Sequence, residues 1–92
     1  MPKKHLHTAH AAVSKRLKRA NGHLANVIDM IAAGRSCRDI AQQLHAVERA
    51  VVAAKKVLIH DHLDHCLADV AETAPATRRA SVDELKDITK YL

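Results

Sequence analysis

Three residues of this 92-residue chain could bind a metal ion together. His62 and Cys66 are four residues apart, so on a helix their side chains lie on one face, one turn from each other. An imidazole and a thiolate together favour zinc, nickel, cobalt or copper over magnesium or calcium. Two ligands are too few for a tight site, and Cys37, the only other cysteine, is the candidate for a third.

The helix that carries these residues is predicted to run from Cys37 to about Asp69. Its apolar residues recur at spacings of three and four: Ile40, Leu44, Val47, Val51, Ala54 and Leu58. At about 1.5 Å per residue, Cys37 and His62 are about 37 Å apart, so one chain cannot close the site. Two copies of the helix, packed antiparallel and crossing near Ala50 or Val51, would bring Cys37 of one copy to His62 and Cys66 of the other. We therefore predict two equivalent sites, each shared between two protomers.

The remaining segments complete a single all-α domain over residues 1–92. A first amphipathic helix is predicted from about Thr8 to Ala33, with apolar residues Val13, Leu17, Ala20, Leu24, Val27 and Ile31. Gly22 should weaken this helix without ending it, Gly34 should end it, and Ser36 should cap the next one. Residues 1–7 are expected to form a flexible arm and residues 71–80 a linker, after which Ser81 opens a last helix.

The charge of the chain indicates an anionic partner. The formal net charge is +5, and four cations follow one another closely in the first helix. We predict that DNA phosphates are contacted by Lys15, Arg16, Lys18, Arg19, Arg49, Lys55 and Lys56. Glu48 interrupts the basic stretch of the second helix and leaves its contribution in doubt.

Other classes of protein are disfavoured by what the sequence lacks. The first residues, MPKKHLHTAH, lack the apolar segment of a signal peptide, and no apolar run approaches the ~20 residues of a membrane span. The chain has no glycine-rich oxyanion loop and no obvious third member for a Cys and His pair. We therefore expect a cytoplasmic protein that is not an enzyme.

Three segments of the chain resemble the CsoR/RcnR family of bacterial metal- and formaldehyde-responsive repressors: KRLKRANGHL, GRSCRDIAQQLHAVERA and LIHDHLDHC. The spacing of Cys37, His62 and Cys66 is also that of the family. The resemblance implies three helices per chain, an antiparallel four-helix dimer core and a tetramer of two dimers. It further implies that the apo protein binds operator DNA and that metal relieves repression of metal efflux genes.

The resemblance also bears on which metal is sensed. Some members carry a fourth, N-terminal ligand, which falls on His5 here, with His7 as its rival; that set accompanies Ni(II) or Co(II). Copper sensors lack this histidine and commonly have a Tyr before the first Cys, where this chain has Ser36, and a Glu in the last helix, a role Glu84 could fill beside the ligands. Ni(II) or Co(II) is therefore the first expectation and Cu(I) the alternative, with Zn(II) possible.

Two further alternatives stay open at this point. A formaldehyde sensor of the family would use Pro2 with Cys37, but the arm here is longer and Cys66 is retained. A metal-storage protein would bind metal without a change in DNA affinity. Near the ligands, His60 and His65 are interpreted as outer or solvent groups. Asp61 and Asp64 are candidates to orient ligating imidazoles.

Overall fold

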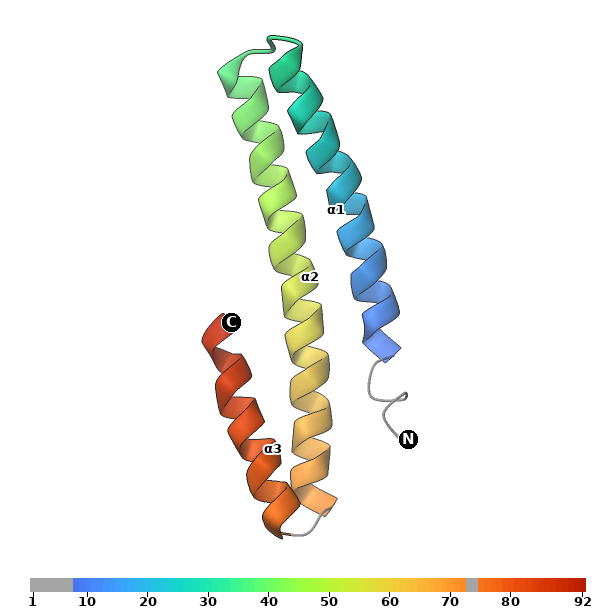
Figure 1. Ribbon diagram of the computed structural model, residues 1–92, viewed down its shortest axis with the longest axis vertical. Helices are drawn as coiled ribbons and strands as arrows, with labels where there is room; N and C mark the ends of the chain where they lie inside the picture. Colours follow the sequence, from blue (N-terminus) through green and yellow to red (C-terminus); the bar gives the residue numbers. More distant parts are fainter. Residues whose placement is uncertain (1–7, 73–74) are drawn as a thin grey trace.

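The computed structural model describes residues 8–72 and 75–92, which form three α-helices and a short closing turn (Figure 1). Helix α1 spans Thr8–Ala32, α2 spans Cys37–Glu72, α3 spans Pro75–Ile88, and the 3₁₀ turn η2 spans Thr89–Tyr91. The described ranges contain no strand, which confirms the all-α prediction. The predicted arm over residues 1–7, with His5 and His7, lies outside the described residues.

The joint between α1 and α2 has the predicted caps. Gly34 has φ of +73°, the left-handed conformation that favours glycine, and the following N–H of Arg35 donates to the carbonyl of Met30 at 3.0 Å. The N–H of Asp39 donates to the hydroxyl of Ser36 at 3.1 Å, so Ser36 is the N-cap of α2. These caps turn the chain back sharply, and α1 and α2 lie antiparallel and side by side (Figure 1).

Helix α3 begins earlier than the sequence analysis predicted. Residues 71–80 were expected to be a linker, but α2 continues to Glu72 and α3 already begins at Pro75. A proline suits the first helical position because its φ is preset and its missing N–H needs no partner there. Ser81, predicted to open the helix as a cap, instead lies inside α3 with a buried side chain.

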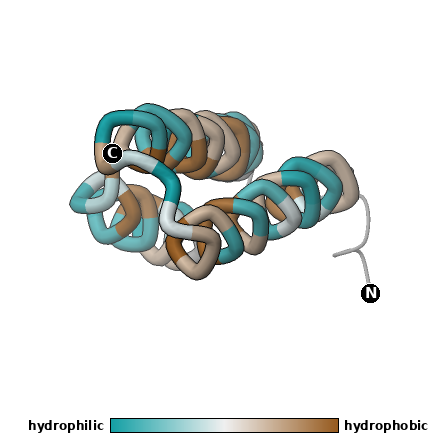
Figure 2. The backbone as a smooth tube through the Cα atoms, turned by 90° about the horizontal axis from the view of Figure 1, so that it is seen from above, coloured by the Kyte–Doolittle hydropathy of each residue, from teal (hydrophilic) through white to brown (hydrophobic). Residues whose placement is uncertain are grey.

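The second helix packs against a neighbour on two sides. Toward α1 it buries Val47 and Ala54, opposite Val13, Ala20 and Val27, which recur every seven residues on α1. Around its far end α2 buries Ile59 and Cys66, where α3 folds back along it (Figure 1). Apolar and polar residues alternate around each helix (Figure 2), so every helix has an apolar side to cover.

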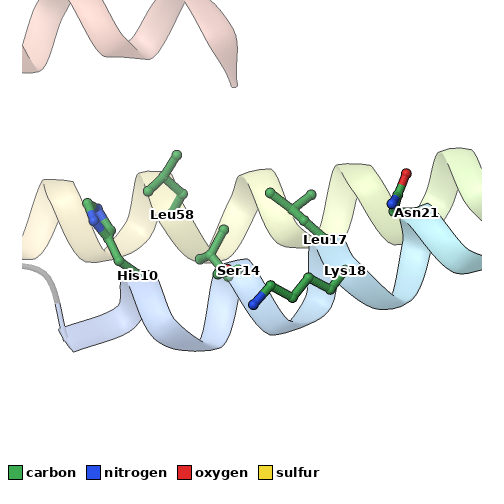
Figure 3. Close-up of a pocket in the computed structure, with 7 residues that line it drawn as sticks. His10, Ser14, Leu17, Lys18, Asn21 and Leu58 are labelled. Carbon is green, nitrogen blue, oxygen red and sulfur yellow. The ribbon is translucent and has the colours of Figure 1, made fainter.

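Part of each predicted apolar stripe remains uncovered in the single protomer. Leu17, Leu24 and Ile31 on α1, and Leu44 and Val51 on α2, are between 39% and 60% exposed. Between the two helices, Leu17 and Leu58 line a hollow of about 410 Å³ (Figure 3). The molecule is elongated, at 59 × 24 × 13 Å, so one chain offers no second layer of described helices to cover these side chains.

None of the helices in the described part of the chain is both long and apolar enough to cross a membrane.

The packing of α3 on α2 predicts a graded loss of stability at Ile59, which is only 2% exposed. Ile59→Val should lower the free energy of unfolding by about 0.5–1.5 kcal/mol and Ile59→Ala by about 2–5 kcal/mol, because each leaves a larger cavity. Urea denaturation followed by circular dichroism measures both. If Ile59→Ala unfolded at the same urea concentration as the unmodified chain, the described packing of Ile59 would be wrong.

Candidate metal site

Two predicted ligands and one predicted neighbour meet where α3 folds back on α2. His62 and Cys66 lie one turn apart on α2, with Cys66 buried to 5% exposure and the His62 side chain to 27%. Glu84 comes from α3 and places its Oε2 atom 3.0 Å from Nε2 of His62. The contact joins the second and third helices at the ligand pair.

The Nε2 atom of His62 is buried but lacks a properly directed hydrogen bond. Although Oε2 of Glu84 is close, it lies off the line of an N–H bond, so the contact is electrostatic in character. A buried ring nitrogen without a hydrogen bond is costly in a protein. A carboxylate next to an imidazole is favourable when the ring carries a proton or a metal ion. The imidazole and thiol of His62 and Cys66 are therefore a pair of candidate ligands, and the carboxylate of Glu84 lies beside the imidazole as a neighbour of the ligand pair.

Cys37 lies far from this pair. It is the first residue of α2, exposed, beside the Ser36 cap. Since α2 is continuous from Cys37 to Glu72, the 25 residues between Cys37 and His62 span about 37 Å. Within the described residues, no group of three His, Cys, Asp or Glu side chains is placed to hold one metal ion. The three predicted ligands do not meet in one protomer, and their sharing between two protomers remains a prediction.

Asp61, a candidate to orient a ligating imidazole, lies beside His65. Nδ1 of His65 lies 2.8 Å from the carbonyl oxygen of Asp61 and 3.6 Å from its carboxylate. Asp61 therefore accompanies His65 and not the ligand candidate His62, because residues four apart share a helix face. His60 is exposed, as a solvent group would be.

The predicted DNA contacts are exposed but do not form one continuous patch. On α1, Arg16 and Arg19 border a hollow with His23 and Ala50, whereas Lys18 borders the hollow of Figure 3 on another side of the helix. Lys15 is also exposed on α1, and Arg49, Lys55 and Lys56 are exposed on α2. Successive residues of a helix point in different directions, so adjacent cations diverge.

On α2, the basic stretch contains the expected interruption. Glu48 shares a hollow with Arg49 and Lys56, and its Oε1 atom lies 3.7 Å from Nδ1 of His45. The carboxylate offsets part of the positive charge there. The four cations of α1 have no carboxylate of that kind among them in the sequence, and their contact with DNA remains a prediction.

One polar link between α1 and α2 was missed by the sequence analysis. Nε2 of His23 lies 2.7 Å from Oε1 of Gln43, across the interface of the two helices. Neither residue belongs to the apolar stripes from which the packing was predicted, so periodicity gave no signal for this bond. It fixes the register of α1, which carries the cations, against α2, which carries the ligand candidates.

Comparison with known proteins places this geometry in a family. A family model described as a metal-sensitive transcriptional repressor matches residues 9–91. The chain belongs to this family. The predicted CsoR/RcnR membership is thereby confirmed, and so is the prediction that the protein is not an enzyme, because the family and the matched relatives are transcriptional repressors. No solved structure matches the chain.

Several relatives in the family are named for copper. The copper-sensing transcriptional repressor CsoR of Mycobacterium ulcerans is 36% identical over 80 residues, covering 87% of this chain and 67% of that protein. CsoR of Bacillus subtilis is 32% identical over 78 residues, covering 85% and 75%, and the copper-sensing repressor RicR of Mycobacterium tuberculosis is 35% identical over 63 residues, covering 67% and 66%. The chain thus spans about two thirds of its mycobacterial relatives. These names support the copper alternative better than the first expectation of nickel or cobalt.

The position of Glu84 predicts that its charge tunes the affinity of His62 for metal. Glu84→Gln should weaken Cu(I) binding by about 10–100-fold, the usual cost of losing a carboxylate beside a ligating histidine. Competition with a Cu(I) chelator measures the affinity. Asp83→Asn is the matched control, because it removes the same charge from the exposed neighbouring position of α3 and should bind as the unmodified chain does. Equal affinities of all three proteins would exclude this role for Glu84.

Proposed function

We propose that this protein is a Cu(I)-responsive repressor, which binds operator DNA without metal and releases it when Cu(I) binds. The observation that carries the choice of copper is the contact of Glu84 with His62 at the Cys66 end of α2. The resemblance to the CsoR/RcnR family implies that copper sensors commonly have a glutamate in the last helix beside the metal ligands. The copper-sensing names of the matched relatives point the same way.

The proposed ligands are Cys37 of one protomer with His62 and Cys66 of another. Two thiolates and an imidazole are soft and borderline donors, which suit Cu(I). The burial of Cys66 favours a site that excludes water, while the exposure of Cys37 leaves its thiol accessible to a second protomer. The continuous α2 supports sharing, because its length keeps the two ends apart within one chain.

The two ring nitrogens of His62 have separate roles in this proposal. A ligating histidine usually directs its other ring N–H at a carboxylate or carbonyl, which fixes the ring and raises its basicity. Glu84 lies at Nε2, which leaves Nδ1 to face the metal. Glu84 is well exposed, so its side chain is free to turn toward the N–H direction. The contact of α3 with α2 would therefore depend on whether His62 binds metal.

Nickel and cobalt are the competing effectors. Their case rests on His5 as a fourth ligand and on Ser36 in place of the tyrosine common before the first Cys of copper sensors. His5 lies outside the described residues, so the contact of Glu84 with His62 decides our choice. Zn(II) would suit the same donors and belongs in the same metal panel.

The uncovered apolar residues of α1 and α2 support self-association as part of the function. An antiparallel dimer would cover Leu17, Leu24, Ile31, Leu44 and Val51, which one chain leaves exposed. We propose the same dimer, assembled further into a tetramer, as the form that binds DNA through the cations of α1. We propose that the protein acts in the cytoplasm, where a repressor meets its DNA.

The proposal predicts that Cu(I) lowers the affinity of the protein for DNA from upstream of its own gene. A loss of at least about 10-fold is expected, a coupling of about 1.4 kcal/mol. Fluorescence anisotropy of labelled DNA, titrated with Cu(I), Ni(II), Co(II) and Zn(II) in turn, measures it. Cys37→Ala should bind DNA with the affinity of the unmodified chain, and this affinity should not fall when Cu(I) is added.

Other outcomes of this titration would contradict the proposal. Release by Ni(II) or Co(II) at lower concentrations than Cu(I) would make the protein a sensor of those metals. Tight Cu(I) binding without any change in DNA affinity would indicate storage. Release of Cys37→Ala by Cu(I) would remove Cys37 from the mechanism.

Sharing of the site predicts that two defective chains complement each other. Cys37→Ala and Cys66→Ala should each bind no Cu(I) tightly as homodimers. In a mixed dimer, the intact Cys37 of one chain meets the intact His62 and Cys66 of the other, so one tight site should return per dimer. Chains carrying both substitutions, mixed with either single variant, are the control and should recover none. A mixed dimer without recovered Cu(I) binding would contradict a site shared between Cys37 of one chain and His62 and Cys66 of the other.

A further inference from the structure

Gly22 lies in the middle of α1, and nothing in the described protomer requires a glycine there. The helix continues through it from Thr8 to Ala32, and Gly34 is the only described residue with a positive φ. A Cβ atom at Gly22 would meet no atom within 4 Å. Glycine is a poorer helix former than alanine because it is more flexible when unfolded. The space beside Gly22 is open, so a ligand outside the protomer can reach the backbone of α1 there.

The surface around Gly22 is strongly cationic. Lys15, Lys18 and Arg19 precede it by seven, four and three residues, so their backbone positions surround Gly22 on the outer part of α1. Lys18 and Arg19 lie on opposite flanks of Gly22, each beside a different hollow. This outer part faces away from the residues that α1 buries against α2. All three cations are exposed, and no carboxylate of the described residues forms an ion pair with them. The only acidic residue of α1 is Asp29, about two turns beyond Gly22.

Beyond Gly22, the same side of the helix carries only short side chains in the next turn. Ala25 and Asn26 follow at three and four residues, and both are exposed. Their side chains are short and uncharged. The outer side of α1 therefore carries long cations before Gly22 and only short side chains in the turn after it. Cations hold phosphates, and a position without a side chain lets a ligand approach the backbone closely.

The chemistry of this side distinguishes a nucleic acid from a second copy of the chain. A second copy would be expected on the apolar side, where Leu17, Leu24 and Ile31 are exposed. The outer side offers unpaired positive charge and no large apolar group, which suits a polyanion. The sugar-phosphate backbone of duplex DNA meets both conditions, because it is charged and continuous.

We propose that Gly22 is the point of closest approach between α1 and the DNA backbone, with Lys15, Lys18 and Arg19 holding the adjacent phosphates. This inference rests on the proposed function and names the surface through which DNA is bound. Any side chain at Gly22 would push the duplex away from α1 and weaken contacts on both sides of it.

Gly22→Ala tests the proposal because it should strengthen the fold and weaken DNA binding at once. The midpoint of thermal unfolding should rise by about 3–6 °C through better helix propensity. The dissociation constant for duplex DNA should rise about 10-fold, and further for Gly22→Leu. Cu(I) affinity should not change. Ala80→Leu, which adds bulk at an exposed position of α3, is the matched control and should leave DNA binding unchanged.

The salt dependence of DNA binding separates this role from the role of the cations. Gly22→Ala keeps every positive charge, so the slope of log affinity against log salt concentration should stay as in the unmodified chain. Lys18→Ala should reduce that slope by about one phosphate contact. If Lys18→Ala weakened DNA binding and Gly22→Ala did not, the inference about Gly22 would fail while the proposed function stood.

Two other results would also overturn it. A change in the molar mass of Gly22→Ala in solution, measured by light scattering, would assign this side of α1 to another protomer. Failure of the unmodified chain to bind any duplex would instead refute the proposed function itself, and the DNA role of Gly22 with it.

Discussion

The unbroken length of α2 is the constraint on which the rest of the molecule depends. A helix of 36 residues cannot bend its first residue back to its last turns, so Cys37 and Cys66 stand at opposite ends of a rigid rod. A metal ion that binds both thiolates must therefore be bound by two copies of α2, one from each protomer. A site assembled from two chains responds to their relative position, and this is the property that a metal-controlled switch needs.

The same helix explains why the protomer leaves so much apolar surface uncovered. Helix α2 has α1 along one side and α3 around its far end, and neither neighbour covers the side that carries Leu44 and Val51. The apolar stripes of α1 and α2 are wider than one helix contact can bury, and this width is typical of helices with two partners. The shared metal site needs a second chain, and so does the burial of Leu44 and Val51. We therefore propose that one interface between protomers serves both.

The sequence was sufficient for the helices and the ligand pair, because both depend on local spacing. Periodicity predicted α1 and α2 within a few residues, and Gly34 and Ser36 marked their joint. The predicted start of α3 was wrong, because Ser81 and the residues after it have the pattern of a helix cap, whereas the helix begins at Pro75. The cap pattern is local, whereas Ser81 is buried by packing that periodicity does not encode. The contact of Glu84 with His62 was foreseen only through family resemblance, since it joins residues 22 positions apart on different helices.

In the proposed function, metal is bound by α2 and DNA by α1, so their coupling would pass from α2 to α1. Within one protomer these helices are fixed by packing at Val47 and Ala54 and by the bond from His23 to Gln43, so they form one stiff unit. A stiff unit transmits a signal by moving as a whole and not by bending. We therefore infer that metal acts on the angle or separation between protomers, which changes the spacing of the two α1 surfaces offered to DNA. Helix α3 places Glu84 3.0 Å from His62, and we propose that this contact changes when His62 binds metal.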